Sequence, residues 1–246
     1  MSKIDVLDKG YVRLRNVMGD DRTIVNAARV SFDKRSEKLT GKDKKLIDFL
    51  AREGHTSPFR HATLQFEVYA PLMIARQWWK YAVGSDHVMD AWNESSRRYI
   101  TENNEFYVPE AGEWRSYPDN VKQGSGEPIP EGKGEFFTSE LIDFIDRGVT
   151  LYNYAIEHGI APEQARLFLP AYGMYVRWYW TASLQSVAHL IEQRTATDAQ
   201  YEFRLYAEAV KKLAEDKFPV SLNALLKTKK GKLYNSELPT KAEVSE

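Results

Sequence analysis

The chain has 246 residues, of which 43% are hydrophobic and 28% are charged, a balance typical of a folded globular protein and not of a disordered chain. Its formal net charge of -1 provides no general attraction to DNA or RNA, so no nucleic-acid polymer is expected as a partner and any anionic ligand must be held by a local cluster of cations. The sequence contains no cysteine, which excludes disulfides, thiolate metal sites and every mechanism that uses a cysteine nucleophile.

The first part of the chain predicts a short strand followed by two helices. Residues 11–14 alternate between polar and apolar side chains, and a helix is expected over residues 20–30, capped by one of the two aspartates that open it. A second helix fits residues 42–52, and Gly54 is expected to end it. The residues expected on the apolar side of this second helix are Leu46, Ile47, Phe49 and Leu50.

A strand that leads directly into a helix is predicted next. Residues 64–69 alternate with a period of two, and Pro71 is expected at the first position of a helix that runs to about Ala82. The stretch 83–92 has no clear period and predicts an irregular loop. This loop continues through an Asn-Glu-Ser-Ser-Arg-Arg-Tyr run toward a strand near residues 106–108.

The second half of the chain is predominantly helical. Residues 121–134 hold four of the 14 glycines and predict a mobile loop, and the alternation from Met174 to Trp180 predicts one strand. Strands and helices are mixed with few βαβ repeats, which favours an α+β fold: one domain over residues 1–228, with a polar tail at 229–246. Helices are expected over residues 136–158, 162–168, 184–194, 198–216 and 219–228.

Absent patterns exclude several kinds of protein and site. No apolar run approaches the ~18–20 residues needed to cross a bilayer, so no membrane contact is expected. The first ten residues lack the features of a secretory signal, and a cytoplasmic location is therefore expected. The HExxH, EF-hand, P-loop and GxGxxG signatures do not occur and the histidines show no ligand spacing, so no metal site is expected.

The densest group of polar residues lies on and after the helix predicted to begin at Pro71. Arginine offers a bidentate fork to phosphate oxygens, and serine hydroxyls with free loop N–H groups can complete the oxygen shell. The group therefore predicts a phosphate site in which Glu94 balances charge or accepts a hydrogen bond from a sugar hydroxyl. The alternative is a set of solvated surface ion pairs. The members of the group are Arg76, Gln77, Lys80, Glu94, Ser96, Arg97 and Arg98.

Short segments along the chain match, in order, those of one enzyme family. The most specific is N-E-x-S-x-R-Y, whose five fixed positions are all present in Asn93–Tyr99. Weaker matches are Ala27–Ser31, His55–His61, Ala75–Trp78, Glu105–Pro109, Ala165–Arg166, Leu169–Pro170, Trp180–Thr181, Arg194 and Ala199–Gln200. Over residues 11–225 the chain thus resembles the flavin-dependent thymidylate synthase family.

The resemblance implies the fold and the reaction of that family. The fold would be a mixed α/β one with a central sheet flanked by helices, assembled as a homotetramer whose active sites are shared between subunits. The reaction would be the reductive methylation of dUMP to dTMP, with 5,10-methylenetetrahydrofolate as carbon donor, FAD as cofactor and NADPH as reductant. The absence of cysteine agrees with this, because ordinary thymidylate synthases use a cysteine thiolate and this family does not.

The resemblance also assigns residues to two sites. Arg194 would polarise the uracil ring and, together with Ser96, would be a catalytic residue. The residues assigned to dUMP are Gln77, Lys80, Glu94, Ser96, Arg97, Arg98 and Arg194, with Arg166 from a neighbouring subunit. The residues assigned to FAD are Ser57, Lys80, Tyr81, Ala82, Glu94, Ser183, Gln185 and His189.

The chain departs from the family pattern on the flavin side. Lys80, Tyr81 and Ala82 stand where the family has an Arg-His-Arg motif, and the stretch that follows is longer than the family spacing. Ser183 and His189 stand where asparagine is common. Two alternatives therefore stay open: a flavin-independent hydroxymethylase of dUMP or dCMP on the same scaffold, which needs no hydride, and a non-catalytic nucleotide-binding protein.

Overall fold

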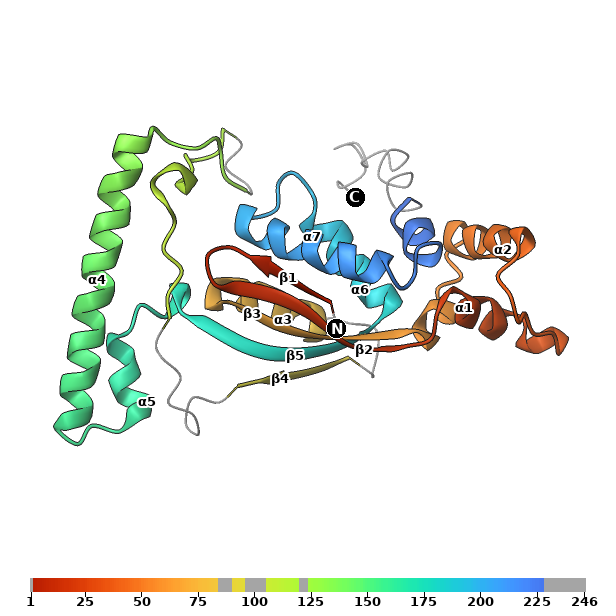
Figure 1. Ribbon diagram of the computed structural model, residues 1–246, viewed down its shortest axis with the longest axis horizontal. Helices are drawn as coiled ribbons and strands as arrows, with labels where there is room; N and C mark the ends of the chain where they lie inside the picture. Colours follow the sequence, from red (N-terminus) through yellow and green to blue (C-terminus); the bar gives the residue numbers. More distant parts are fainter. Residues whose placement is uncertain (1, 84–89, 96–104, 120–123, 228–246) are drawn as a thin grey trace, which may run out of the picture.

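The computed structural model (Figure 1) describes residues 2–83, 90–95, 105–119 and 124–227 of the chain. Ser96, Arg97 and Arg98, the predicted tail at 229–246 and most of the loop predicted at 83–92 lie outside the described residues. In the part that is described, no helix combines the length and the apolar character that crossing a bilayer requires.

Five antiparallel strands within the described residues form one sheet at the centre of the molecule: β1 (Lys3–Val6), β2 (Gly10–Met18), β3 (Thr63–Pro71), β4 (Ala91–Glu94) and β5 (Tyr175–Ser183). Their order across the sheet is β1-β2-β3-β5-β4 (Figure 1). β3 and β5 pair over their whole length, with Phe66 opposite Trp180 and Val68 opposite Trp178. The predicted α+β fold is confirmed, because every pairing is antiparallel and no βαβ crossover is needed.

The named α-helices are α1 (Asp21–Ala28), α2 (Gly41–Arg52), α3 (Leu72–Val83), α4 (Glu131–Glu157), α5 (Pro162–Ala165), α6 (Leu184–Arg194) and α7 (Tyr201–Glu215). Residues 221–227 are also helical. The 3₁₀ turns are η1 (Val30–Phe32), η2 (Ser57–His61), η3 (Ala111–Glu113), η4 (Arg166–Phe168) and η5 (Ala171–Gly173). Helices α3, α6 and α7 bury their apolar sides against one face of the sheet, where Leu64, Phe66 and Val68 of β3 alternate inward.

The opposite face of the sheet is polar and holds a buried carboxylate. Glu67 of β3 is only 3% exposed, and it accepts hydrogen bonds from the Tyr11 hydroxyl at 2.6 Å and from Arg15 Nε at 2.5 Å. Burial by itself raises the pKa of Glu67, but these hydrogen bonds and the charges of Arg15 and Arg13 hold the pKa below its usual value. The carboxylate is therefore ionised and paired at neutral pH, which allows its burial.

Helices α1 and α2 begin and end largely as predicted. Asp20 caps α1 by accepting hydrogen bonds from two first-turn backbone N–H groups, and Thr40 caps α2 by accepting one from the Asp43 N–H. Gly54 follows the end of α2 with a φ of +72°, a left-handed conformation that favours glycine. The placement of Phe49 on the apolar side of α2 is wrong: it is 43% exposed, because two helical steps turn it away from buried Ile47.

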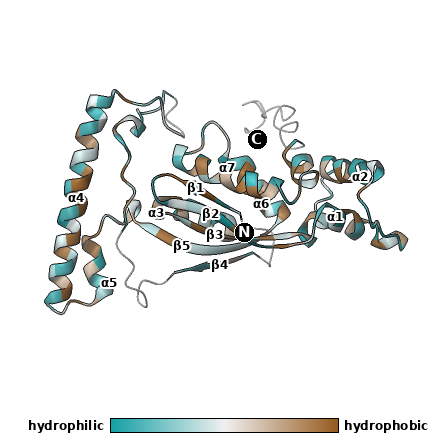
Figure 2. Cartoon of the chain, in the orientation of Figure 1, coloured by the Kyte–Doolittle hydropathy of each residue, from teal (hydrophilic) through white to brown (hydrophobic). Residues whose placement is uncertain are grey.

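Helix α4 forms, with α5 and η4, an arm that stands away from the sheet (Figure 1). The helix begins at Glu131, within the stretch that the glycine content predicts as a loop. Several large apolar side chains of the arm face solvent, and hydrophobic segments are visible along it (Figure 2). Among them are Phe136, Phe144, Tyr154 and Leu167. Exposed apolar groups on one element are typical of a protein–protein interface.

The prediction of an irregular chain through Trp92 is wrong. Residues Ala91–Glu94 form strand β4 at the edge of the sheet, in register with β5. The indole of Trp92 stacks on that of Trp178 with 4.7 Å between ring centroids and meets Trp79 of α3 edge-on at 5.3 Å. This ring packing stabilises a strand whose sequence alternates too briefly to be recognised.

Two further details of the prediction are wrong. Residues 106–108 form no strand, and Phe106 makes only a single bridge to Met174. Pro71 ends β3 instead of opening α3, because the strand needs no N–H donor there and the next N–H, that of Leu72, donates to the Met174 carbonyl at 2.8 Å.

Gly10 allows the close approach of β2 to helix α7. A Cβ added at Gly10 would lie 1.8 Å from the Tyr206 hydroxyl and 2.7 Å from the Tyr69 carbonyl oxygen, to which that hydroxyl donates a hydrogen bond. We expect Gly10→Ala to lower the free energy of unfolding by about 2–3 kcal/mol, because it overpacks the core and breaks this hydrogen bond. The control is Gly41→Ala, where an added Cβ meets nothing within 4 Å. Urea unfolding measures both, and equal stability of the two variants would contradict this packing.

Candidate active site

Helix α3 turns the first group of predicted site residues away from the core. Trp78 is fully buried and meets the ring of Trp178 edge-on, with 5.4 Å between centroids. Because this anchor fixes the rotation of the helix, Gln77 and Tyr81 lie partly exposed and Lys80 lies exposed. The three polar residues occupy a single side of the helix, as their spacing of three and four residues requires.

Gln77 is held by a hydrogen-bonded pair of amides. Its Nε2 donates to the Gln200 side-chain oxygen, just before α7, and to the Met73 carbonyl at 3.4 Å. Gln200 Nε2 in turn donates to Glu202 Oε2 at 2.9 Å. The Glu202 carboxylate therefore orients the Gln200 amide, and Gln200 in turn orients Gln77, the residue that the resemblance assigns to dUMP.

Arg194 lies between two aromatic rings at the end of α6. Its guanidinium carbon is 5.3 Å from the ring centroid of Tyr81 and 5.0 Å from that of Phe203. Its Nε is buried and has no hydrogen-bond partner in the described part of the chain. Burial raises the pKa of the Tyr81 phenol, although the charge of Arg194 acts in the opposite direction. The phenol is therefore neutral at neutral pH.

The outer surface of α6 carries two further predicted residues beside Tyr81. The His189 side chain is 53% exposed, and its ring centroid lies 5.7 Å from that of Tyr81. One turn earlier, Gln185 Oε1 accepts a hydrogen bond from Arg60 Nε of η2 at 3.0 Å. This contact brings exposed Ser57, the first residue of η2, to the same end of the molecule.

Ser183 has a structural role that its sequence position does not reveal. It is 2% exposed, and its hydroxyl accepts a hydrogen bond from the Ser186 backbone N–H at 3.2 Å as the N-cap of α6. The side chain is therefore engaged inside the protein and does not offer its hydroxyl to a ligand.

Three predicted residues of the nucleotide site cannot be placed, and one lies elsewhere. Ser96, Arg97 and Arg98 fall outside the described residues. Glu94 ends strand β4, on the edge of the sheet beside α3. Arg166 lies on the arm, at the start of η4, whereas Arg194 ends α6 next to the sheet (Figure 1). A single chain therefore does not bring Arg166 to Arg194.

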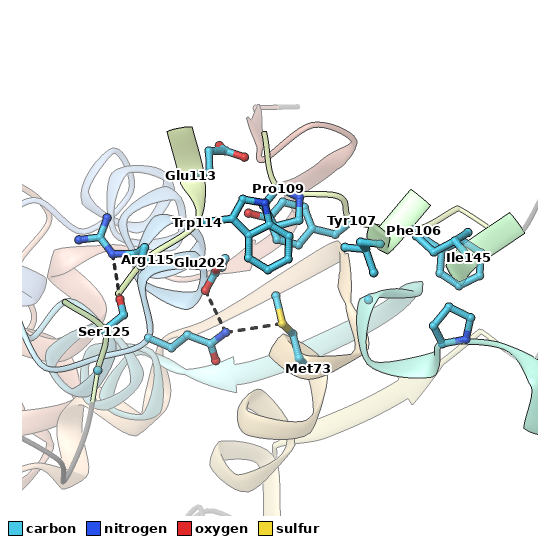
Figure 3. A pocket seen from close by; sticks show the side chains of 15 residues that line it. Met73, Phe106, Tyr107, Pro109, Glu113, Trp114, Arg115, Ser125, Ile145 and Glu202 are labelled. Carbon is cyan, nitrogen blue, oxygen red and sulfur yellow. Dashed lines mark hydrogen bonds between the residues drawn. The ribbon is translucent and has the colours of Figure 1, made fainter. Parts of the chain in front are cut away.

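A cavity of about 400 Å³ lies between the start of α3, the start of α7 and the arm (Figure 3). Gln200 and Glu202 line it, so the hydrogen bond from Gln77 joins the cavity to the predicted nucleotide site. Sequence reasoning missed this cavity because its walls come from segments far apart in the chain. The sequence pointed to a few of its lining residues, because they fall in segments that resemble family motifs: Glu105–Pro109, Leu169–Pro170 and Ala199–Gln200.

Comparison with known proteins decides the family. A family model described as thymidylate synthase complementing protein matches residues 13–220 of the chain. The flavin-dependent thymidylate synthase of Thermus thermophilus is 37% identical over 222 residues, which cover 89% of this chain and 76% of that protein. The chain belongs to the flavin-dependent thymidylate synthase family.

Other relatives agree with this placement. The flavin-dependent thymidylate synthase of Thermotoga neapolitana is 35% identical over 228 residues, which cover 92% of this chain and 94% of that protein. Among solved structures, the UMP/dUMP methylase PolB from Streptomyces cacaoi, bound with 5-Br UMP, is 25% identical and superposes with a TM-score of 0.77. That match covers 92% of this chain and 97% of the other. The resemblance inferred from the motifs is confirmed at the level of the family and the fold.

The two serines that the family resemblance assigns to FAD differ in their surroundings. Ser183→Ala removes the N-cap of α6, and we expect it to lower the free energy of unfolding by about 1 kcal/mol. Ser57→Ala changes an exposed side chain at the start of η2, and we expect no measurable change in stability. Thermal and urea unfolding of both variants test this. A Ser183→Ala protein as stable as the parent would contradict the cap.

Proposed function

We propose that this chain is a flavin-dependent thymidylate synthase, which converts dUMP to dTMP with 5,10-methylenetetrahydrofolate as carbon donor and NADPH as reductant. The observation that carries the proposal is the environment of Arg194. Its guanidinium is fixed between two rings, and its buried Nε has no partner among the residues described. Leaving this donor unpaired costs free energy, and the guanidinium charge is the feature that an anionic ligand would recognise. Bound FAD supplies the hydride that this chemistry requires.

Arg194 would act on the uracil ring of dUMP. A fixed cation beside the pyrimidine favours the form that has lost the N3 proton and carries negative charge on its carbonyl oxygens. That charge makes C5 more nucleophilic toward the methylene carbon, so a thiolate at C6 is not needed. Neutral Tyr81 does not cancel the arginine charge, and its ring limits the directions in which the guanidinium can point.

The rest of dUMP would be held by residues on α3, on β4 and in the run that follows β4. Gln77, fixed by Gln200, would donate to the nucleotide, and Lys80 would offset the phosphate charge. Glu94 would accept a hydrogen bond from a sugar hydroxyl. The full set that we propose is Gln77, Lys80, Glu94, Ser96, Arg97, Arg98 and Arg194, with Arg166 of another subunit.

The residues proposed for FAD lie along α6, at the end of α3, at the start of η2 and at the end of β4. A flavin dinucleotide has an anionic pyrophosphate and a planar ring system. The exposed cations Lys80 and Arg60 can pair with the pyrophosphate. The ring of Tyr81, which is partly exposed, and that of His189, which is exposed, can stack on the ring system. The residues present therefore fit the cofactor, with Ser183 acting through the cap of α6. The full set is Ser57, Lys80, Tyr81, Ala82, Glu94, Gln185 and His189.

A homotetramer in the cytoplasm completes the proposal. The exposed apolar side chains of the arm would form the interface, and Arg166 lies on the same arm, away from the Arg194 site of its own chain. Assembly would carry Arg166 into the site of a neighbour.

The test of the function is product formation by the purified protein with dUMP, 5,10-methylenetetrahydrofolate, NADPH and FAD. We expect dTMP, identified by mass, and a loss of at least about 100-fold in kcat for Arg194→Ala, since a preorganised donor to developing charge is removed. The control is Arg52→Ala, an exposed arginine on α2 that forms an ion pair with its neighbour Glu53. Unchanged turnover in Arg194→Ala would remove the basis of the assignment.

The same assay separates the alternatives. A product heavier than dTMP by one oxygen atom, formed without FAD or NADPH, would identify a hydroxymethylase, which Ala82 and Tyr81 in place of the family's Arg and His favour. Binding of dUMP without turnover under any combination of cofactors would identify a non-catalytic nucleotide-binding protein.

The shared site makes a separate prediction about mixtures. Arg166→Ala and Arg194→Ala each remove a different side of the site, so we expect both homomeric variants to be nearly inactive. After the two are unfolded together and refolded, mixed oligomers contain sites with both arginines, and partial activity should return. The control is each variant refolded alone. A mixture as inactive as its components would show that Arg166 does not serve a neighbouring subunit.

A further inference from the structure

The cavity between α3, α7 and the arm has walls that are mostly apolar. Trp114 and Phe106 supply aromatic surface (Figure 3), and aliphatic and thioether side chains supply the rest of the apolar wall. The apolar members are Met73, Phe106, Pro109, Trp114, Leu141, Ile145 and Pro170. A volume of about 400 Å³ lies within the range of ~300–1,000 Å³ that small-molecule sites occupy. The body of a ligand here would therefore be apolar or aromatic.

Two carboxylates in the wall lack a cation. Glu113 and Glu202 both line the cavity, and neither forms an ion pair with any residue that the structure describes. Arg115 lines it too, but its Nε donates to the Ser125 hydroxyl at 2.9 Å and its guanidinium lies over the Tyr201 ring at 4.7 Å. Among the described residues, the wall thus carries one more negative than positive charge.

A tyrosine hydroxyl gives a second and independent sign of a ligand. Tyr107 is 5% exposed and lines the cavity, and its hydroxyl has no hydrogen-bond partner within the described part of the chain. Burial, together with the charges of Glu113 and Glu202, raises the pKa of this phenol, so it is neutral. A neutral phenol can accept a hydrogen bond from an ammonium group, and the two carboxylates can balance the positive charge of that ammonium group.

We propose that this cavity binds a small organic cation, an ammonium group on an aromatic or aliphatic body. The charge would lie between Glu113, Glu202 and the Tyr107 hydroxyl, and the body against Trp114 and Phe106. Desolvating such a cation is offset by two carboxylates and by aromatic faces, whereas an anion or a nucleotide phosphate would meet repulsion from the same carboxylates. The site is therefore distinct in chemistry from the cationic site at Arg194.

The cavity also has a physical connection to Gln77. Glu202 accepts a hydrogen bond from Gln200, and Gln200 accepts one from Gln77. A cation that draws the Glu202 carboxylate away from Gln200 would loosen the support of Gln77. This part of the inference rests on the proposed function, and it predicts that the ligand raises the KM for dUMP more than it changes kcat.

The test uses three probes of similar size and different charge. They are 2-phenylethylammonium, neutral 2-phenylethanol and anionic 3-phenylpropionate, titrated calorimetrically into the full-length protein at neutral pH. We expect the cation to bind at least about tenfold more tightly than the alcohol, which corresponds to about 1.4 kcal/mol, and the anion not to bind. Equal affinity of the cation and the alcohol, or no binding of any probe, would overturn the proposal without any variant.

Variants then locate the binding. Glu202→Gln and Glu113→Gln should each weaken the cation by about fivefold or more and leave the alcohol unchanged, and Tyr107→Phe should weaken only the cation. The control is Glu208→Gln, an exposed glutamate on α7 that pairs with Lys211 at 3.8 Å. Unfolding curves of each variant establish whether the fold is kept. For a variant that does not fold, the three probes titrated into the parent protein remain the test of cation binding.

One further source of the cation must be separated from a free ligand. A lysine or arginine of a second copy of the chain has the same chemistry. If it occupied the cavity, the probe would compete with assembly, and sedimentation would show smaller species as the probe is added. That outcome would overturn the free-ligand assignment. Tighter binding of the cation with an unchanged oligomer supports it, whether or not dTMP is formed.

Discussion

The packing of Trp78 is the constraint on which the rest of the site depends. Its ring meets Trp178 and Trp180 edge-on at 5.4 and 5.5 Å and stacks on Phe203 at 5.4 Å, so one side chain joins α3, β5 and α7. Interiors are packed too densely for such a residue to shift by more than a fraction of its own size. The neighbours of Trp78 on α3 therefore face fixed partners: Gln77 meets Gln200, and Tyr81 meets Arg194.

The same helix separates two regions of opposite charge. Met73 lies in the first turn of α3 and lines the cavity that holds Glu113 and Glu202, whereas Lys80 lies in the last turn, beside the Arg194 region. The peptide dipoles of a helix favour negative groups at its N-terminus and positive groups at its C-terminus. The acidic cavity and the cationic site thus each lie at the end of α3 that stabilises them. The side-chain charges at the two ends of α3, which these dipoles stabilise, would separate an anionic nucleotide from an organic cation before any specific contact forms.

Local patterns in the sequence were sufficient for elements whose stability is local. Residues 64–69 alternate because β3 has a core face and a polar face, and Asp20 caps α1 through its own next turn. Strand β4 could not be found, because ring packing between Trp92 and Trp178 stabilises it. The role of Ser183 as a cap and the contact of Tyr81 with Arg194 depend likewise on tertiary neighbours. Motif order identified the family, but it could not reveal a cavity built from separated segments.

Two of the positions that depart from the family pattern pack against each other, so they are not unrelated losses. Tyr81 stands where the family has histidine, and His189 stands where asparagine is common. Their ring centroids lie 5.7 Å apart, and the ring of Tyr81 also packs against the Arg194 guanidinium. A site that had merely decayed would have no reason to place two changed residues in contact with each other and with a retained arginine. His189 lies on the outer side of α6, where its side chain is 53% exposed. The two changed positions therefore belong to the packing that surrounds the Arg194 guanidinium.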